Sequence, residues 1–147
     1  MSMPDWSETL LDCKSKKGLT FEAIAKELGQ DKTWTATLMM GQASASKEQA
    51  EKLVKLLGAP SELAVKLTEF RQKGALATAV PTDPLLYRLY ELIIVHGPAM
   101  KAVIHEMFGD GIMSAIDFSM DIKKQEDPKG DRVVVTLNGK FLPYKKW

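Results

Sequence analysis

The fold is decided by one stretch of the chain, Asp83-Pro-Leu-Leu-Tyr-Arg-Leu-Tyr-Glu-Leu-Ile-Ile-Val95. Asp83 followed by Pro84 is typical of a helix start, because aspartate caps free backbone N–H groups and proline fits the first turn. Arg88 and Glu91 stand three residues apart, so they share one face of this helix. The other positions are apolar almost all round, which is typical of a helix that is buried on most sides. In a chain of 147 residues, this pattern indicates that another chain covers the helix.

Residues 1–74, upstream of this stretch, predict a bundle of short helices. Candidate N-caps are Thr20, Asp31 and Ser46, and Ser46 forms a capping box with Gln49. Glycines close three of the predicted helices, at Gly29, Gly41 and Gly58. Short helices with such stops are typical of a helix-turn-helix bundle.

A helix-turn-helix bundle raises the alternative of a DNA-binding regulator. The candidate recognition helix, residues 31–40, offers one lysine and begins with an acidic residue, whereas recognition helices present basic and amide side chains. Residues 1–73 carry 11 basic and 10 acidic side chains, and residues 74–147 carry nine of each. Neither half has the positive excess that a phosphate backbone demands. Hydroxyl groups are still able to contact phosphates, so a regulator with a C-terminal dimerisation domain that senses a small anion stays an alternative.

The second half of the chain is predicted to be a mixed α+β domain. Small residues at 75–83 form a connector, and residues 84–147 form the domain. Its first helix is predicted to run to about residue 95, with Leu86, Leu89, Tyr90 and Ile93 packing inward. Gly97-Pro98 is predicted to break it before a second helix that ends near residue 108.

Strands are predicted to follow these helices. Apolar residues alternate with polar ones over residues 116–122, which predicts a half-buried strand. Residues 132–137 predict a second strand, Asn138-Gly139 a tight turn, and residues 140–147 a third short strand. Three short strands make a poor sheet alone, so we expect pairing with another chain.

Composition limits the cellular setting and the chemistry. Hydrophobic residues make up 45% of the chain and charged residues 27%, as in ordinary globular proteins. Cys13 is the single cysteine, which excludes an intramolecular disulfide and a cysteine-based zinc site. The N-terminus lacks the pattern of a signal peptide, and the apolar run at residues 92–95 is too short to span a bilayer. We therefore expect a reducing, cytoplasmic location, no nucleic-acid or membrane partner, and no metal.

Two groups of residues are candidates for chemistry. Arg88 and Glu91 lie among apolar positions, where a charged pair is costly unless it is hydrogen-bonded or wetted by a pocket, although a plain surface salt bridge remains an alternative. Ser114 lies in Gly109-Asp-Gly-Ile-Met-Ser-Ala-Ile116, in phase with the apolar strand residues, so its hydroxyl is predicted to face inward. A glycine-rich turn of this kind is able to bind anions through its backbone N–H groups. From spacing alone, a hydroxyl that is satisfied by local backbone is the simpler interpretation of Ser114.

These motifs together resemble one known family. Tyr87-Arg-Leu-Tyr-Glu91, Phe108-Gly-Asp-Gly-Ile-Met-Ser-Ala-Ile-Asp-Phe118 and Leu137-Asn-Gly-Lys-Phe-Leu-Pro143 closely resemble the C-terminal domain of the cyanases, also called cyanate hydratases or cyanate lyases. Residues 19–42 resemble the N-terminal helical bundle of that family. The likeness extends over roughly residues 9–143, with the motifs in the family's order.

The resemblance implies both a fold and a reaction. It implies a λ-repressor-like bundle that does not bind DNA, a catalytic and dimerisation domain with intertwined strands, and a homodecamer of five dimers with active sites between subunits. It implies a carbon–oxygen lyase that decomposes cyanate with bicarbonate as co-substrate, through carbamate, to ammonia and carbon dioxide, without a cofactor or metal. By position, the resemblance makes Arg88, Glu91 and Ser114 catalytic. Arg88, Ser114 and Ala115 would bind the substrates.

Overall fold

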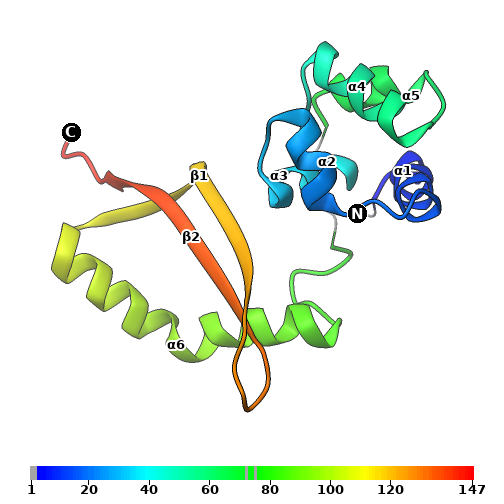
Figure 1. Ribbon diagram of the computed structural model, residues 1–147. Helices are drawn as coiled ribbons and strands as arrows, with labels where there is room; N and C mark the ends of the chain where they lie inside the picture. Colours follow the sequence, from blue (N-terminus) through cyan, green and yellow to red (C-terminus); the bar gives the residue numbers. More distant parts are fainter. Residues whose placement is uncertain (1–2, 72, 75) are drawn as a thin grey trace. The chain divides into compact units, whose positions relative to one another are not determined.

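The computed structural model describes residues 3–71, 73–74 and 76–147 and has the α+β fold that the sequence predicts (Figure 1). Its elements are α1 (Asp5–Lys16), α2 (Phe21–Leu28), α3 (Lys32–Met39), α4 (Lys47–Leu57), α5 (Leu63–Thr68), α6 (Pro84–Phe108), β1 (Gly111–Gln125) and β2 (Arg132–Pro143). The chain divides into two compact units, residues 1–77 with 121–134 and residues 78–120 with 135–147. The two strands pair with each other in one sheet.

The helix starts predicted at Thr20, Asp31 and Ser46 are confirmed. Thr20 accepts a hydrogen bond from the backbone N–H of Ala23 at 3.1 Å, and Asp31 accepts one from Thr33 at 2.7 Å. Ser46 and Gln49 form both hydrogen bonds of the capping box at the start of α4. Each cap satisfies backbone groups that the first helical turn leaves without partners, so local chemistry fixes where these helices begin.

The hydrophobic core lies within the bundle. Every residue of its buried cluster falls between Leu10 and Leu67, on α1 to α5 and the loops that join them. Leu10, Ile24, Leu38 and Leu53 are completely buried. Apolar burial on this scale stabilises a small helical unit without disulfides or metal.

The predicted helix break at Gly97-Pro98 is wrong. Helix α6 runs without interruption over 25 residues, with Pro98 inside it. Proline lacks a backbone N–H and its ring crowds the preceding turn, so it removes one helical hydrogen bond, and it can bend a helix without ending it. The ribbon of α6 changes direction near its middle (Figure 1). Asp83 caps its start as predicted, since Asp83 Oδ1 accepts a hydrogen bond from the N–H of Leu86 at 3.0 Å.

The predicted turn at Asn138-Gly139 and the third strand at residues 140–147 are also wrong. Strand β2 continues through both positions to Pro143. A tight hairpin turn of the Asn-Gly type requires a glycine with positive φ, and Gly139 does not have one. The hairpin reverses instead at residues 126–131, where Gly130 has a φ of +122°.

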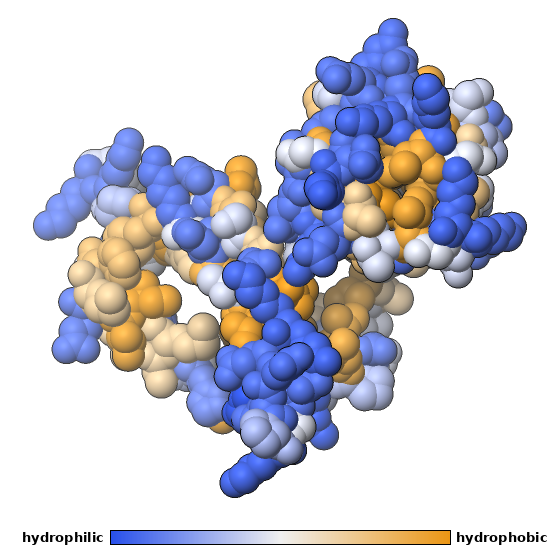
Figure 2. All heavy atoms as spheres, in the orientation of Figure 1, coloured by the Kyte–Doolittle hydropathy of each residue, from blue (hydrophilic) through white to orange (hydrophobic). Residues whose placement is uncertain are grey.

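Helix α6 has no buried residue within a single chain. The prediction that Leu86, Leu89 and Ile93 pack inward is therefore wrong at this level, because these side chains are 38%, 46% and 55% exposed. Twelve large apolar side chains of the helix are exposed: Leu85, Leu86, Tyr87, Leu89, Leu92, Ile93, Ile94, Val95, Met100, Val103, Met107 and Phe108. Figure 2 shows hydrophobic side chains at the surface of the molecule. None of the helices in the described part of the chain is long and apolar enough to cross a membrane.

Candidate functional site

Arg88 and Glu91 form an ion pair on the first turns of α6. Arg88 Nη1 donates a hydrogen bond to Glu91 Oε2 at 2.8 Å, as their spacing on one helix face predicts. This hydrogen bond and the negative charge of Glu91 raise the pKa of Arg88 above its ordinary value. The side chains are 72% and 42% exposed. The pair therefore presents a permanent, oriented cation on a surface that is otherwise apolar.

Ser114 lies near the start of β1 and is buried as predicted, although Ile116, which was predicted to share its buried face, is exposed. Ser114 is only 6% exposed. Its Oγ accepts hydrogen bonds from the backbone N–H groups of Ile116 at 3.1 Å and Asp117 at 3.0 Å. The local backbone thus satisfies both acceptor sites of the oxygen. For these two sites, the simpler interpretation of the sequence is confirmed. The hydroxyl hydrogen is not used by either of these bonds, so Ser114 keeps a donor.

The structure brings Arg88 and Glu91 together but does not join Ser114 to them. Among the hydrogen bonds and ion pairs of residues 3–71, 73–74 and 76–147, none links Ser114 with Arg88 or Glu91. Ala115 is exposed next to the buried serine. Within one chain, the grouping of these four residues into a single site stays a prediction.

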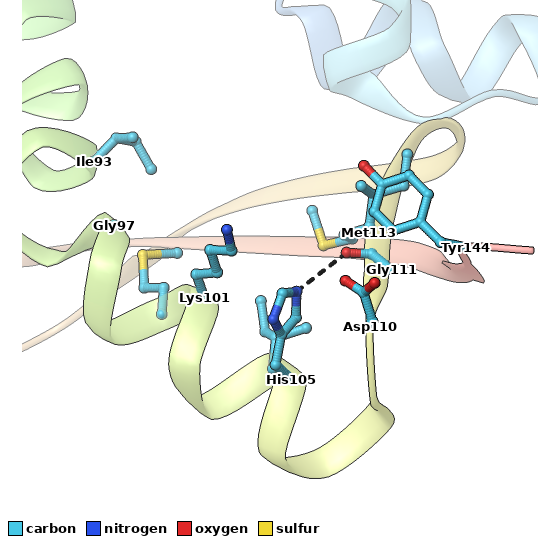
Figure 3. Close-up of a pocket in the computed structure, with 11 residues that line it drawn as sticks. Ile93, Gly97, Lys101, His105, Asp110, Gly111, Met113 and Tyr144 are labelled. Carbon is cyan, nitrogen blue, oxygen red and sulfur yellow. Dashed lines mark hydrogen bonds between the residues drawn. The ribbon is translucent and has the colours of Figure 1, made fainter. Parts of the chain in front are cut away.

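A pocket of about 380 Å³ lies between α6 and the base of the hairpin (Figure 3). Its wall is formed by Ile93, Gly97, Met100, Lys101, Ile104, His105, Asp110, Gly111, Ile112, Met113 and Tyr144. His105 Nε2 lies 3.3 Å from the Gly111 carbonyl oxygen and donates to it when that nitrogen carries the proton. Phe108 and Phe141 stack nearby with ring centroids 5.1 Å apart. These contacts fix the beginning of β1, three residues before Ser114, although no predicted site residue lines the pocket.

Metal ligation is not suggested by the described residues. In the described ranges, no three His, Cys, Asp or Glu side chains are grouped so that they could hold a metal ion. Arg88 and Ser114 offer N–H and O–H donors, which suit an anion.

Two glycines of the hairpin were not identified as site residues from the sequence. A Cβ at Gly139 would overlap the Ser114 carbonyl oxygen, and a Cβ at Gly111 would overlap the Leu142 carbonyl oxygen. Both glycines therefore serve a close approach of two backbones. The glycines themselves were visible in the sequence, but their role depends on which residue lies opposite, and that is set by strand pairing.

Two family descriptions match the chain, one for each half. "Cyanate hydratase, N-terminal" matches residues 5–69, and "Cyanate lyase C-terminal domain" matches residues 78–146. Together they include the bundle, α6 and both strands.

Curated relatives match along the whole length. The chain is 57% identical over 147 residues to the "Cyanate hydratase" of Acaryochloris marina, with all of both chains covered. It is 58% identical to the "Cyanate hydratase" of Synechocystis sp., with 94% of this chain and 92% of the relative covered. A solved structure, the crystal structure of cyanase from T. urticae, has a TM-score of 0.85 and 38% identity, and covers 94% of this chain and 96% of that one.

Ser114→Ala is expected to destabilise the protein, because it leaves the N–H groups of Ile116 and Asp117 without their acceptor. Each of these partly buried hydrogen bonds is expected to contribute about 0.5–1.5 kcal/mol. The thermal midpoint at fixed protein concentration is the measurement, and Ser119→Ala, an exposed serine on the same strand, is the matched control. Equal midpoints for the two variants would contradict the structural role of the Ser114 oxygen.

Proposed function

This chain belongs to the cyanate hydratase family of lyases, and we propose that it decomposes cyanate with bicarbonate to ammonia and carbon dioxide. The observation that carries the proposal is the identity of 57% to a cyanate hydratase over the full length of both chains. The catalytic residues that we propose are Arg88, Glu91 and Ser114. The cytoplasm is the proposed location, in keeping with a chain that has one cysteine.

Arg88 is the proposed anchor for the anions. Cyanate and bicarbonate each carry one negative charge, and bringing them together in water is opposed by their repulsion and their hydration. A guanidinium group offers several donors in one plane and stays protonated at any working pH. The hydrogen bond that Arg88 donates to Glu91 holds that plane in one orientation, so Glu91 supports binding through Arg88. Once water is excluded around it, each charge-assisted hydrogen bond becomes stronger.

Ser114 and Ala115 are proposed to orient cyanate. The Ser114 hydroxyl has a donor left after its two backbone bonds, and the backbone N–H of Ala115 would add a second donor beside it. Donors placed where charge develops stabilise a transition state more than the ground state.

The proposed reaction balances without a cofactor. A bicarbonate oxygen attacks the carbon of cyanate, and the mixed anion that forms loses carbon dioxide by cleavage of a C–O bond. The remaining carbamate takes up protons and releases ammonia and a second carbon dioxide. In sum, one cyanate, one bicarbonate and two protons give one ammonia and two carbon dioxide molecules. No electron is transferred, so the residues need only hold two anions together and move protons.

We further propose that the working form is a homo-oligomer, a decamer of five dimers with intertwined strands. Helix α6 exposes twelve large apolar side chains, and a hairpin of two strands is marginal alone. A second copy of the chain supplies apolar surface of the same kind. Assembly would also bring Ser114 of one copy within reach of Arg88 of another.

The alternative of a DNA-binding regulator receives no support from the relatives. The relatives named above are cyanate hydratases, and both halves of the chain match that family.

Ammonia release from cyanate tests the proposed reaction. With purified full-length protein, we expect ammonia to form with added bicarbonate and to fall to background in bicarbonate-free buffer. Ammonia that forms equally well in both buffers would mean that water, and not bicarbonate, is the second reactant. No ammonia in either buffer would overturn the proposed function.

Arg88→Ala is expected to lower kcat/KM for cyanate by at least about a hundredfold, because it removes the cation that holds both anions. Arg88→Lys keeps the charge but loses the planar fork, so we expect an intermediate loss. The control is Arg132→Ala, an exposed arginine at the start of β2. Normal turnover by Arg88→Ala would rule out the proposed site.

Ile94→Asp is expected to break the assembly and abolish turnover together. Ile94 is 54% exposed on α6, and a carboxylate is strongly disfavoured in an apolar interface. Mass photometry reports the oligomeric state, and the exposed Lys101→Ala on the same helix is the control. A monomeric Ile94→Asp variant with normal turnover would show that one chain contains a complete site.

A further inference from the structure

The two strands of the hairpin differ in length. Strand β1 has 15 residues and β2 has 12, although they pair with each other. Strand β1 has twelve residues from Ser114 to its end at Gln125, whereas β2 has only eight from Arg132 to Gly139, which lies against Ser114, so β1 must bulge in this region. A bulge leaves some backbone groups of the longer segment without partners across the sheet. The N–H groups of Ile116 and Asp117 are bonded to Ser114 Oγ, which marks the bulge. The Ile116 side chain is 97% exposed, as expected where the strand bends outward.

Gly139 lies opposite this bulge on β2. A Cβ at position 139 would overlap the carbonyl oxygen of Ser114 and come within 2.6 Å of Met113 Cγ. The Met113 side chain can move aside, but the Ser114 carbonyl belongs to the backbone. Any side chain at position 139 therefore displaces the backbone of Ser114. Because Gly139 does not have a positive φ, this close approach, and not a special backbone conformation, explains the glycine.

The bulge decides what the Ser114 hydroxyl is able to do. A serine hydroxyl has one donor and two acceptor sites, and the amides of Ile116 and Asp117 occupy the acceptor sites. Two donors on one oxygen also polarise its O–H bond and make it a stronger donor. The bulge thus fixes the oxygen and leaves only its hydrogen for a ligand, and an anion needs such a donor.

We propose that Gly139 is a positioning residue for this reaction: by presenting no side chain to the Ser114 backbone, it permits the bulge that directs the Ser114 hydroxyl hydrogen to an anionic substrate. The inference rests on the proposed function, since it requires a substrate anion at Ser114. Gly139 itself touches no substrate.

Gly139→Ala tests this role with two measurements on the full-length oligomer. We expect kcat/KM for cyanate to fall about ten- to hundredfold, the range expected when a catalytic donor moves by about 1 Å. We also expect faster hydrogen exchange at the amides of Ile116 and Asp117, because their acceptor is displaced. A glycine needed only for stability would not change these two readouts together.

Gly130→Ala is the matched control. Gly130 lies in the turn of the same hairpin with a φ of +122°, and a Cβ there meets nothing within 4 Å. The substitution strains the backbone and should lower the thermal midpoint, while kcat/KM and exchange at the Ser114 bulge stay as in the wild type.

A second pair of variants covers the case in which Gly139→Ala does not fold. Met113→Ala removes the side-chain overlap and leaves the overlap with the Ser114 carbonyl, so Met113→Ala/Gly139→Ala should fold more readily and still be about tenfold slower than Met113→Ala alone. Equal kcat/KM for these two variants, or unchanged exchange in a folded Gly139→Ala variant, would overturn the positioning role. A wild-type protein that releases no ammonia from cyanate would overturn the proposed function instead, and hydrogen exchange would still report whether Gly139 holds the bulge.

Discussion

The apolar surface of α6 must be covered, and the second unit of the chain depends on this constraint. Burying one large apolar side chain contributes about 1.5–3 kcal/mol, and α6 exposes twelve of them. In the proposed oligomer, the same cover would change the electrostatics of Arg88 and Glu91. An ion pair that is open to water contributes only about 0–1 kcal/mol, whereas the same charges act strongly on an anion once neighbouring apolar groups exclude water. In the proposed assembly, hydrophobic burial and substrate binding would be two results of one contact.

Ser114 shows how a backbone irregularity produces a specific hydrogen-bond donor. In a regular strand, the amides of Ile116 and Asp117 would point to opposite edges, so neither would be bonded to the serine and its hydroxyl would be free to turn. In the bulge, both amides donate hydrogen bonds to the Ser114 oxygen instead. The orientation of the hydroxyl then follows from the course of the backbone. The two glycines of the hairpin that allow close backbone approach, Gly111 and Gly139, lie at and opposite this part of β1.

Features that depend on neighbours in sequence were predicted well from the sequence. The caps at Thr20, Asp31 and Ser46 and the pairing of Arg88 with Glu91 were predicted, since each involves residues two or three positions apart. Pro98 and Gly139 were misread because each residue type has two uses. Proline either ends a helix or bends it, and glycine either makes a turn or allows a close contact. The choice depends on distant residues, such as Ser114 for Gly139, and a local pattern contains no information about them. The proposed meeting of Ser114 with Arg88 would be of the same non-local kind.

The uneven distribution of the core has a consequence for the order of folding. The buried cluster between Leu10 and Leu67 forms from contacts that are close in sequence, so the bundle is able to fold rapidly and while the rest of the chain is still being synthesised. Residues 84–108 leave the ribosome later, and none of them is buried within a single chain. If a second chain provides the cover, the last folding step is bimolecular, and its rate rises with protein concentration. At low expression, the population that accumulates would have a finished bundle and an unfinished C-terminal half.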